Sequence, residues 1–167
     1  MFLKIAAETG DLDNSRSLMR SFIEWHRERH REDLDLINSY FNEVEFEKEL
    51  AELPGKFASP AGRLYVAYEG NSPAGCAALR ALGGGRCEMK RMFVAAQFRG
   101  KGIGVALATQ IIADAEQIGY RTIRLDTSHR QTEAIALYER LGFHEIDAYY
   151  EVSGAMRAWL RFFERAV

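Results

Sequence analysis

The sequence predicts one α/β (α+β) domain with a mixed, largely antiparallel central sheet flanked by helices. Two observations lead to this class. Residues 63–94 hold three strand-like runs separated by glycine-containing turns of hairpin length, which is typical of an antiparallel meander. Residues 103–149 then alternate between helical and strand-like patterns, as in a strand–helix–strand unit. With 167 residues, the chain can bury one core but is too short for two ordinary domains and a linker.

The N-terminal part is predicted from short periodic runs. Residues 2–8 alternate apolar and polar side chains, which indicates a strand. A helix then runs to about Arg31 and has Asp13 or Ser15 as its candidate cap. Residues 45–53 indicate a second short helix, which Pro54 ends. The three strands of the meander follow at residues 63–69, 75–82 and 86–94.

The C-terminal part begins with a helix over residues 103–118, which Gly119 ends. The elements expected after it are a strand at 121–127, a helix at 132–141, a strand at 143–149 and a last strand at 155–164.

Composition narrows the functional classes. The net charge of −2 and the pI near 6.1 show no basic excess of the kind that nucleic acids or anionic membranes attract. No stretch approaches the ~18 apolar residues of a membrane span, and the N-terminal residues lack the pattern of a signal peptide. We therefore expect a cytoplasmic protein with no nucleic-acid or membrane partner. Cys76 and Cys87 lie apart in apolar runs, which favours two buried thiols over a disulfide or a metal site.

The stretch QFRGKGIGVALATQII, residues 97–112, combines three glycines and two cations directly before the predicted helix. The first-turn N–H groups of a helix have no intrahelical partners and carry the positive end of its dipole, so a bare loop there can bind an anion. A P-loop string is absent, and the dinucleotide fingerprint fails because Val105 and Leu107 stand where its last small residue belongs. For a single glycine-rich turn, a flexible loop with two solvated cations is the plain alternative.

Three segments together resemble the GCN5-related N-acetyltransferase (GNAT) family. RGKGIG, residues 99–104, is similar to the family's R/Q-x-x-G-x-G/A signature. It follows EMKRMFV and precedes AIALYERLGF, in the family's order and spacing. The resemblance runs from Leu3 to about Tyr150 and is least specific before Arg63. It implies a GNAT-like fold, one N-acetyltransferase domain over residues 1–167 and acetyl-CoA as cosubstrate.

By this resemblance, the loop's backbone N–H groups hold the pyrophosphate of acetyl-CoA, and the preceding strand splays from the next one so that pantetheine can pair with its edge. The implied cofactor-binding residues are Met92, Phe93, Val94, Arg99, Gly100, Lys101, Gly102, Ile103 and Gly104. Gln131 is added although the sequence departs from the family there, because the family often has a shorter amide, Asn, at this place. No metal is implied.

Acyl transfer to an amine requires a proton for the departing thiolate and a neutral nucleophile. Tyr138, in ALYERLGF, resembles the family's general acid, and the alternative is a tyrosine that only packs. Glu88 lies in an otherwise apolar strand, where a carboxylate either pairs with a cation or has a raised pKa and acts as a base. Lys90 and Arg80 are the cations within reach, and some family members have a basic Glu at this strand position.

Two further constellations have plainer interpretations. His26 and His30 stand at i and i+4, but no third metal ligand is evident, so a solvated helix face is expected. Tyr149 and Tyr150 could wall an acceptor site, although two aromatics at a sheet edge more often pack.

The sequence therefore predicts an acetyl-CoA-dependent N-acetyltransferase that acts on the primary amine of a small molecule, with a peptide N-terminus as the alternative acceptor. The rival from another class is an acyl-CoA-binding sensor that has lost the chemistry. The sequence leaves open whether the chain forms a homodimer.

Overall fold

The computed structural model describes the whole chain from Met1 to Val167. The strands are β1 (Phe2–Ile5), β2 (Arg63–Glu69), β3 (Ser72–Gly83), β4 (Arg86–Val94), β5 (Thr122–Ser128), β6 (His144–Ile146) and β7 (Leu160–Ala166). The helices are α1 (Thr9–Arg29), α2 (Leu34–Tyr40), α3 (Glu43–Glu52), α4 (Ile103–Ile118), α5 (Thr132–Arg140) and α6 (Gly154–Trp159), and three short 3₁₀ turns join some of them.

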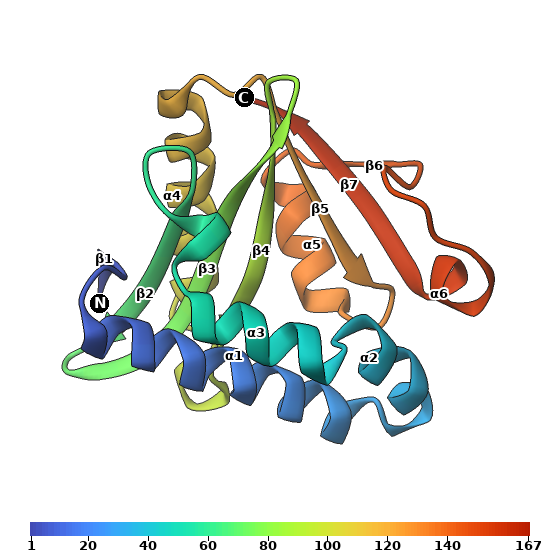
Figure 1. Cartoon of the computed structure of the whole chain (residues 1–167), viewed down its shortest axis with the longest axis horizontal. Coiled ribbons are helices and arrows are strands. Elements are labelled where there is room, and N and C mark those ends of the chain that lie inside the picture. Colours follow the sequence, from blue (N-terminus) through green and yellow to red (C-terminus); the bar gives the residue numbers. More distant parts are fainter.

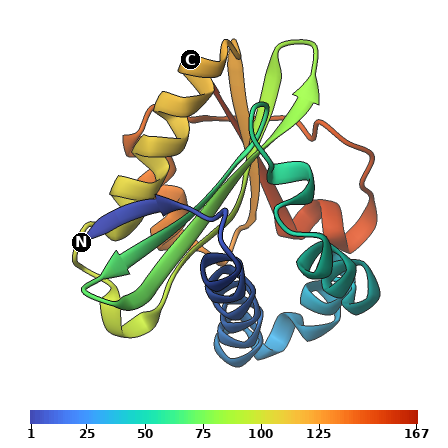
Figure 2. The ribbon, with the colours of Figure 1, turned by 60° about the vertical axis from the view of Figure 1, so that its left-hand side comes forward.

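The strands form one sheet in the order β1-β2-β3-β4-β5-β7-β6 (Figure 1). Every neighbouring pair is antiparallel except β4 and β5, which run parallel. The predicted mixed, largely antiparallel sheet is confirmed. Figure 2 shows helices on both faces of this sheet, with α1, α2 and α3 on one side and α4 on the other.

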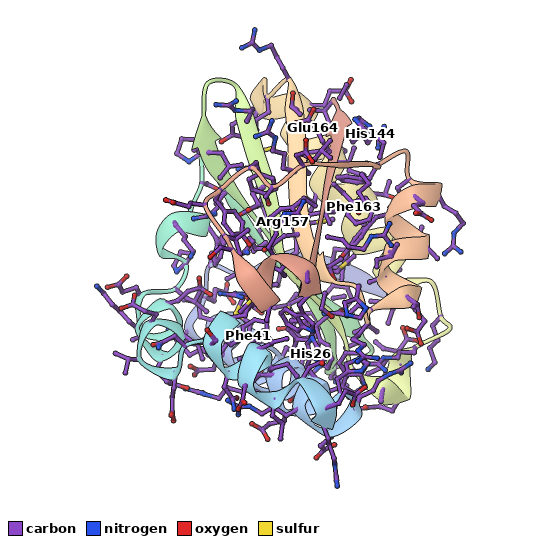
Figure 3. All side chains as sticks on the ribbon, turned by 90° about the vertical axis from the view of Figure 1, so that its right-hand side faces the viewer. His26, Phe41, His144, Arg157, Phe163 and Glu164 are labelled. Carbon is purple, nitrogen blue, oxygen red and sulfur yellow. The ribbon has the colours of Figure 1, made fainter.

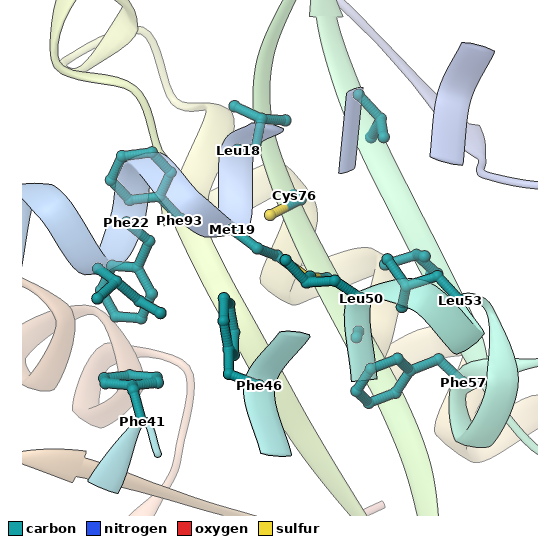
Figure 4. Close-up of a cluster of buried hydrophobic side chains, with 14 of the residues drawn as sticks. Leu18, Met19, Phe22, Phe41, Phe46, Leu50, Leu53, Phe57, Cys76 and Phe93 are labelled. Carbon is teal, nitrogen blue, oxygen red and sulfur yellow. The ribbon is translucent and has the colours of Figure 1, made fainter. Parts of the chain in front are cut away.

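Each face of the sheet carries its own apolar core, because successive side chains of a strand point to opposite faces. On β3, Cys76 and Ala78 face the core under α1 and α3, whereas Ala77 and Leu79 face the core under α4. Figure 4 shows the first of these cores, where side chains of α1 and α3 such as Met19 pack over Cys76. A central strand buried on both faces reads as an almost continuous apolar run.

The predicted thiols are confirmed, because Cys76 and Cys87 are both free and buried. Burial raises the pKa of each thiol to about 12. Neither thiol is therefore a ready nucleophile.

The bounds of β2, β4 and α4 match the predicted ranges, but the start of α1 does not. This helix begins at Thr9, and neither Asp13 nor Ser15 caps it. Asp13 instead accepts a hydrogen bond from Arg16 at 2.7 Å, and the Ser15 hydroxyl donates to the Asp11 carbonyl at 2.9 Å inside the helix. The predicted cap was wrong because both side chains are used within the helix.

The last predicted strand, residues 155–164, was also partly wrong. Its first half is helix α6, and strand β7 begins only at Leu160. Helix α2, seven residues long, was not predicted. Trp159 at the end of α6 donates its indole N–H to Asp33 at 3.0 Å, at the start of α2. Contacts between distant segments, which local periodicity does not record, hold both short helices in place.

Candidate active site

The turn between β4 and α4 uses backbone that favours glycine. Gly100 and Gly102 have φ angles of +77° and +78°, in the left-handed region. A Cβ atom at either position would meet nothing within 4 Å, so the backbone and not the packing demands glycine. Gly104 differs, because its φ is not positive and its Cβ would meet only the side chains of Leu137 and Val94, at 3.6 and 3.8 Å.

The first turn of α4 presents free N–H groups. The first N–H that bonds a backbone carbonyl is that of Ala106, which donates to Gly102 at 3.0 Å. No side chain caps the helix, so the N–H groups of Ile103, Gly104 and Val105 have no protein acceptor. Unpaired N–H groups at the positive end of a 16-residue helix form a site for an anion.

Strand β4 leaves β5 just before this turn. The two strands pair only over three residues, Arg86 to Glu88 against Thr122 to Arg124. On the other side of β4, the pairing with β3 shifts register between Cys76 and Ala78, and Arg91 in the extra stretch has a φ of +56°. This bulge bends the C-terminal end of β4 away from β5. The expected splay of the strands is present, and Figure 1 shows α5 beside the opening.

A groove of about 440 Å³ lies at this opening. Nine of the ten predicted cofactor-binding residues line it, namely Met92, Phe93, Val94, Arg99, Gly100, Gly102, Ile103, Gly104 and Gln131. Lys101 does not line it; its ammonium lies 5.5 Å from the centre of the Phe98 ring. Phe22 and Trp25 of α1 also line the groove, and sequence reasoning missed them because their spacing fits a core-facing helix equally well.

Arg99 lines the groove and is held between β4 and α1. Its Nε donates to the Val94 carbonyl at 3.0 Å, and its guanidinium lies 4.4 Å from the centre of the Trp25 ring. Burial, with a smaller contribution from Arg29, lowers the pKa of Arg99. Arg29 in turn donates to Glu133 of α5 at 2.7 Å. Arg99 therefore places a guanidinium in the groove that the first turn of α4 lines, with Arg29 close enough to Arg99 to affect its pKa, and this positive charge suits a phosphate ester.

Tyr138 lies where this groove meets a second, smaller cavity. It lines both spaces and is 6% exposed. Burial raises the pKa of its phenol, and the nearby Asp126 and Tyr40 raise it further. The phenol therefore keeps its proton at neutral pH, as a proton donor must.

Glu88 is buried with 0% exposure and is fully engaged. One carboxylate oxygen accepts from the Arg80 Nε at 2.7 Å, and the other accepts from the Tyr149 hydroxyl at 2.5 Å. The Lys90 ammonium lies 4.0 Å away. Glu88 lines neither the groove nor the cavity that Tyr138 joins. The ion pair that the sequence offered as an alternative is therefore present.

Asp126, at the end of β5, is a second buried carboxylate, and its side chain is 1% exposed. It accepts hydrogen bonds from Lys90 at 3.1 Å, from Tyr40 at 2.8 Å and from Tyr150 at 2.5 Å. Burial favours its neutral form, but Lys90 and the two phenols outweigh this and hold the pKa of Asp126 below its usual range.

Asp126 and Lys90 line the cavity with Tyr138, although neither was a predicted site residue. The signal was a carboxylate in the apolar strand TIRLDTS, the same signal that singled out Glu88. Tyr149 and Tyr150 bond to the two carboxylates, so the two tyrosines do more than pack at a sheet edge.

His26 and His30 lie on one side of α1, but the expectation that this face is solvated was wrong. They are 0% and 7% exposed, and their ring centres are 4.9 Å apart. Figure 3 shows His26 near Phe41, and His26 lines the small cavity. No third His, Cys, Asp or Glu completes a ligand set with them. Trp25, Phe41 and Trp159 surround the two rings, which explains why this face is buried.

Comparison with known proteins agrees with this geometry. The family model described as "Acetyltransferase (GNAT) family" matches residues 20–143. An uncharacterised N-acetyltransferase of Schizosaccharomyces pombe is 39% identical over 61% of this chain, a match that spans 64% of that relative's length. An uncharacterised N-acetyltransferase of Dictyostelium discoideum is 28% identical over 90% of this chain and 93% of its own.

Solved structures share the fold. An acyl-CoA N-acyltransferase of Klebsiella pneumoniae, described as putative, superposes with a TM-score of 0.73 at 24% identity, over 99% of this chain and 96% of its own. The PaiA N-acetyltransferase of Thermoplasma acidophilum, solved in complex with coenzyme A, has a TM-score of 0.72 at 15% identity over the full length of both chains. No helix of this chain combines the length and the apolar character that a bilayer crossing needs.

The bulged and splayed strand, the left-handed glycine turn, the free N–H groups of α4 and the family match over most of the chain agree: this protein belongs to the GNAT family of acetyltransferases and uses acetyl-CoA.

Proposed function

We propose that residues 1–167 form one N-acetyltransferase domain that transfers the acetyl group of acetyl-CoA to the primary amine of a small molecule. The observation that carries this proposal is the place of Tyr138, which lines both the cofactor groove and the buried polar cavity. A residue at this junction can act on the thioester from one side while the acceptor amine approaches from the other.

Acetyl-CoA supplies the activated acetyl group. Its pyrophosphate would lie on the N–H groups of Ile103, Gly104 and Val105, with Arg99 and Arg29 as nearby cations. Its pantetheine arm would follow Met92, Phe93 and Val94 on the unpaired edge of β4. Gln131 lines the same groove and is the candidate amide contact.

Tyr138 is the proposed general acid. As the amine nitrogen bonds to the acetyl carbon and the carbon–sulfur bond breaks, the phenol would give its proton to the sulfur so that CoA leaves as a thiol. The nitrogen would lose its extra proton to solvent as the amide forms, and the phenolate would recover one proton from solvent, so that the reaction neither gains nor loses a proton overall. Burial raises the pKa of Tyr138, so at neutral pH the phenol is in the protonated form that a general acid requires.

A carboxylate is the proposed base for the acceptor ammonium, and the geometry favours Asp126 over Glu88. Asp126 is held ionised and lines the cavity beside Tyr138, so an ammonium there would meet its negative charge. Glu88 stays a candidate that would have to act from outside the cavity, through the hydroxyl of Tyr149 or through Lys90.

A small acceptor is favoured by the size of the cavity, about 50 Å³, which leaves room for only a few atoms beyond the reacting amine. The test is a screen of primary amines with acetyl-CoA, in which free thiol is followed and the acetylated product is identified by mass. We expect amine-dependent thiol release. Thiol release that never depends on a small amine, or acetylation of peptide N-termini alone, would overturn the small-molecule proposal.

A further inference from the structure

The small cavity holds two polar side chains that no protein group satisfies. Both ring nitrogens of His26 and the hydroxyl of Ser128 lack a hydrogen-bond partner. The two residues are 0% and 2% exposed, so bulk solvent does not reach them. They come from α1 and from the end of β5, and both line the cavity that Tyr138 joins to the cofactor groove.

Unpaired polar groups in an interior are unfavourable, and folded proteins contain few of them. Apolar side chains at such a buried site would make the fold more stable. Polar side chains that lower stability without a structural benefit are typical of a binding site. The surroundings of His26 are apolar and aromatic, because Phe22, Phe41 and Trp159 all lie near its ring, so an apolar side chain would suit this position.

The charged groups around the cavity are already matched in pairs. Lys90 bonds to Asp126 at 3.1 Å, and Arg91 bonds to Glu49 at 2.7 Å. Any further charge on an acceptor would be buried without a free counterion, which is unfavourable. Burial also lowers the pKa of His26 to about 4, so its ring is neutral at physiological pH and offers one N–H donor and one nitrogen acceptor.

We propose that His26 and Ser128 determine acceptor specificity by binding a neutral group that both donates and accepts hydrogen bonds, a hydroxyl or an amide, close to the reacting amine. The acceptor class is then an amino alcohol or an amino amide, and not a simple alkylamine, a diamine or a free amino acid. This inference rests on the proposed function, because it assumes that the amine reacts beside Tyr138.

The first experiment compares five amines of nearly equal size with the wild-type protein. Ethanolamine and glycinamide carry the proposed neutral group, whereas propylamine, ethylenediamine and glycine carry a methyl group, a second ammonium and a carboxylate. We expect kcat/KM for ethanolamine or glycinamide to exceed that for the other three by about tenfold or more, the usual effect of leaving a site's buried polar groups unpaired.

The amide could belong to a small molecule or to the first peptide bond of a peptide acceptor, and a short peptide that begins with glycine distinguishes the two. If it reacts as well as glycinamide, the amide belongs to a peptide N-terminus; if it does not react, the acceptor is a small amide or alcohol.

The second experiment uses variants and a stability measurement. In the wild-type protein, kcat/KM for the preferred amine should exceed kcat/KM for propylamine. Ser128→Ala and His26→Phe should each remove most of this preference, so that the two values of kcat/KM differ by no more than about threefold. Ser128→Ala should leave the melting temperature unchanged or raise it, because no hydrogen bond is lost. Ser15→Ala is the matched control, since Ser15 is equally buried but donates to the Asp11 carbonyl at 2.9 Å, and this change should lower the melting temperature.

Two outcomes overturn the inference. If propylamine reacts as fast as ethanolamine and glycinamide, the neutral group is not recognised, although the proposed function stands. If Ser128→Ala lowers the melting temperature and leaves the preference over propylamine unchanged, Ser128 has a structural role only. Failure of all five amines and of the peptide would instead remove the proposed function, and this inference with it.

Discussion

Replacing Gly104 by Ala should strengthen the fold, whereas replacing it by the branched Val should weaken acetyl-CoA binding. Gly104 is the second residue of α4, its φ is not positive, and an added Cβ would meet side-chain atoms no closer than 3.6 Å. Alanine should therefore fit without strain and gain about 0.5–1 kcal/mol of helix stability. For a domain of this size, that gain corresponds to a rise of about 1–4 °C in Tm.

The methyl group of Ala would lie between Val94 and Leu137, which line the cofactor groove with Gly104. The signature that this loop resembles has Gly or Ala at this position, so Gly104→Ala should leave the Kd for acetyl-CoA within about threefold of wild type. The branched side chain of Val is larger and would keep a phosphate from the free N–H groups of the first turn. A hydrogen bond to a charged group contributes about 1.5–3 kcal/mol, so the loss of one should raise the Kd for acetyl-CoA by about 10- to 150-fold.

The assay is calorimetric titration of each variant with acetyl-CoA, together with a thermal melt. Gly10→Ala is the matched control: Gly10 is also the second residue of its helix, α1, its φ is not positive, and its Cβ would meet nothing within 4 Å. It should gain similar stability with unchanged Kd. A Gly104→Val protein that binds acetyl-CoA within about threefold of wild type would refute the assignment of α4 as the phosphate site. A fall in the Tm of Gly104→Ala would refute the steric reasoning.

Three further predictions concern the catalytic groups and the buried histidine. Tyr138→Phe should lower kcat by about 10²–10⁴ and leave acetyl-CoA affinity nearly unchanged, because only the acidic proton is lost; steady-state kinetics and titration check this, and a wild-type kcat would make the hydroxyl structural. Asp126→Asn and Glu88→Gln should both lower the free energy of unfolding, because they leave Lys90 and Arg80 unpaired, but only Asp126→Asn should also reduce kcat/KM, most at low pH, where the amine is protonated. The opposite pattern in pH–rate profiles would make Glu88 the base. The free energy of unfolding, measured in denaturant, should fall as the pH drops from 6.5 towards 4. In this range the unfolded state binds a proton on His26, whereas the folded state, in which His26 is buried beside His30 and Asp33, binds it only near the lowered pKa of about 4. The loss is at most about 3 kcal/mol, and His26→Phe should make the free energy of unfolding depend less steeply on pH.

The parts of the fold that could be predicted are those in which local pattern and tertiary environment agree. The start of β4 and both ends of α4 match because β4 begins directly after the turn glycines 83–85 and α4 lies between Gly102 and the left-handed cap Gly119. Helices α2 and α6 could not be predicted, because each is short and is held by a partner far along the chain, as Trp159 is by Asp33. The spacing of apolar residues along the sequence contains no information about such distant partners.

The site divides in the same way. The glycine turn and Tyr138 belong to segments that follow one another along the sequence in the order typical of the family, so the cofactor groove could be predicted from the sequence. The polar cavity draws its groups from α1, α2, β4 and β5, and only the folded chain brings His26, Tyr40 and Asp126 together. Glu88 shows the remaining difficulty. The sequence pattern of a carboxylate in an apolar strand is the same whether the carboxylate faces a substrate or an ion-pair partner, and here the partner is Arg80.

The contact between Arg99 and Trp25 makes the protein suited to an optical measurement. The chain has two tryptophans, and Trp159 is buried at 3% exposure and bonded to Asp33, in a setting that cofactor binding should not disturb. Trp25 is half-buried, lines the cofactor groove and has the Arg99 guanidinium 4.4 Å from its ring centre. A phosphate ester that draws Arg99 away would change the field at this indole, so the emission of Trp25 should shift on cofactor binding. Trp25→Phe should then leave a single, unresponsive fluorophore, and stopped-flow fluorescence of the unlabelled protein would follow cofactor entry and release in real time.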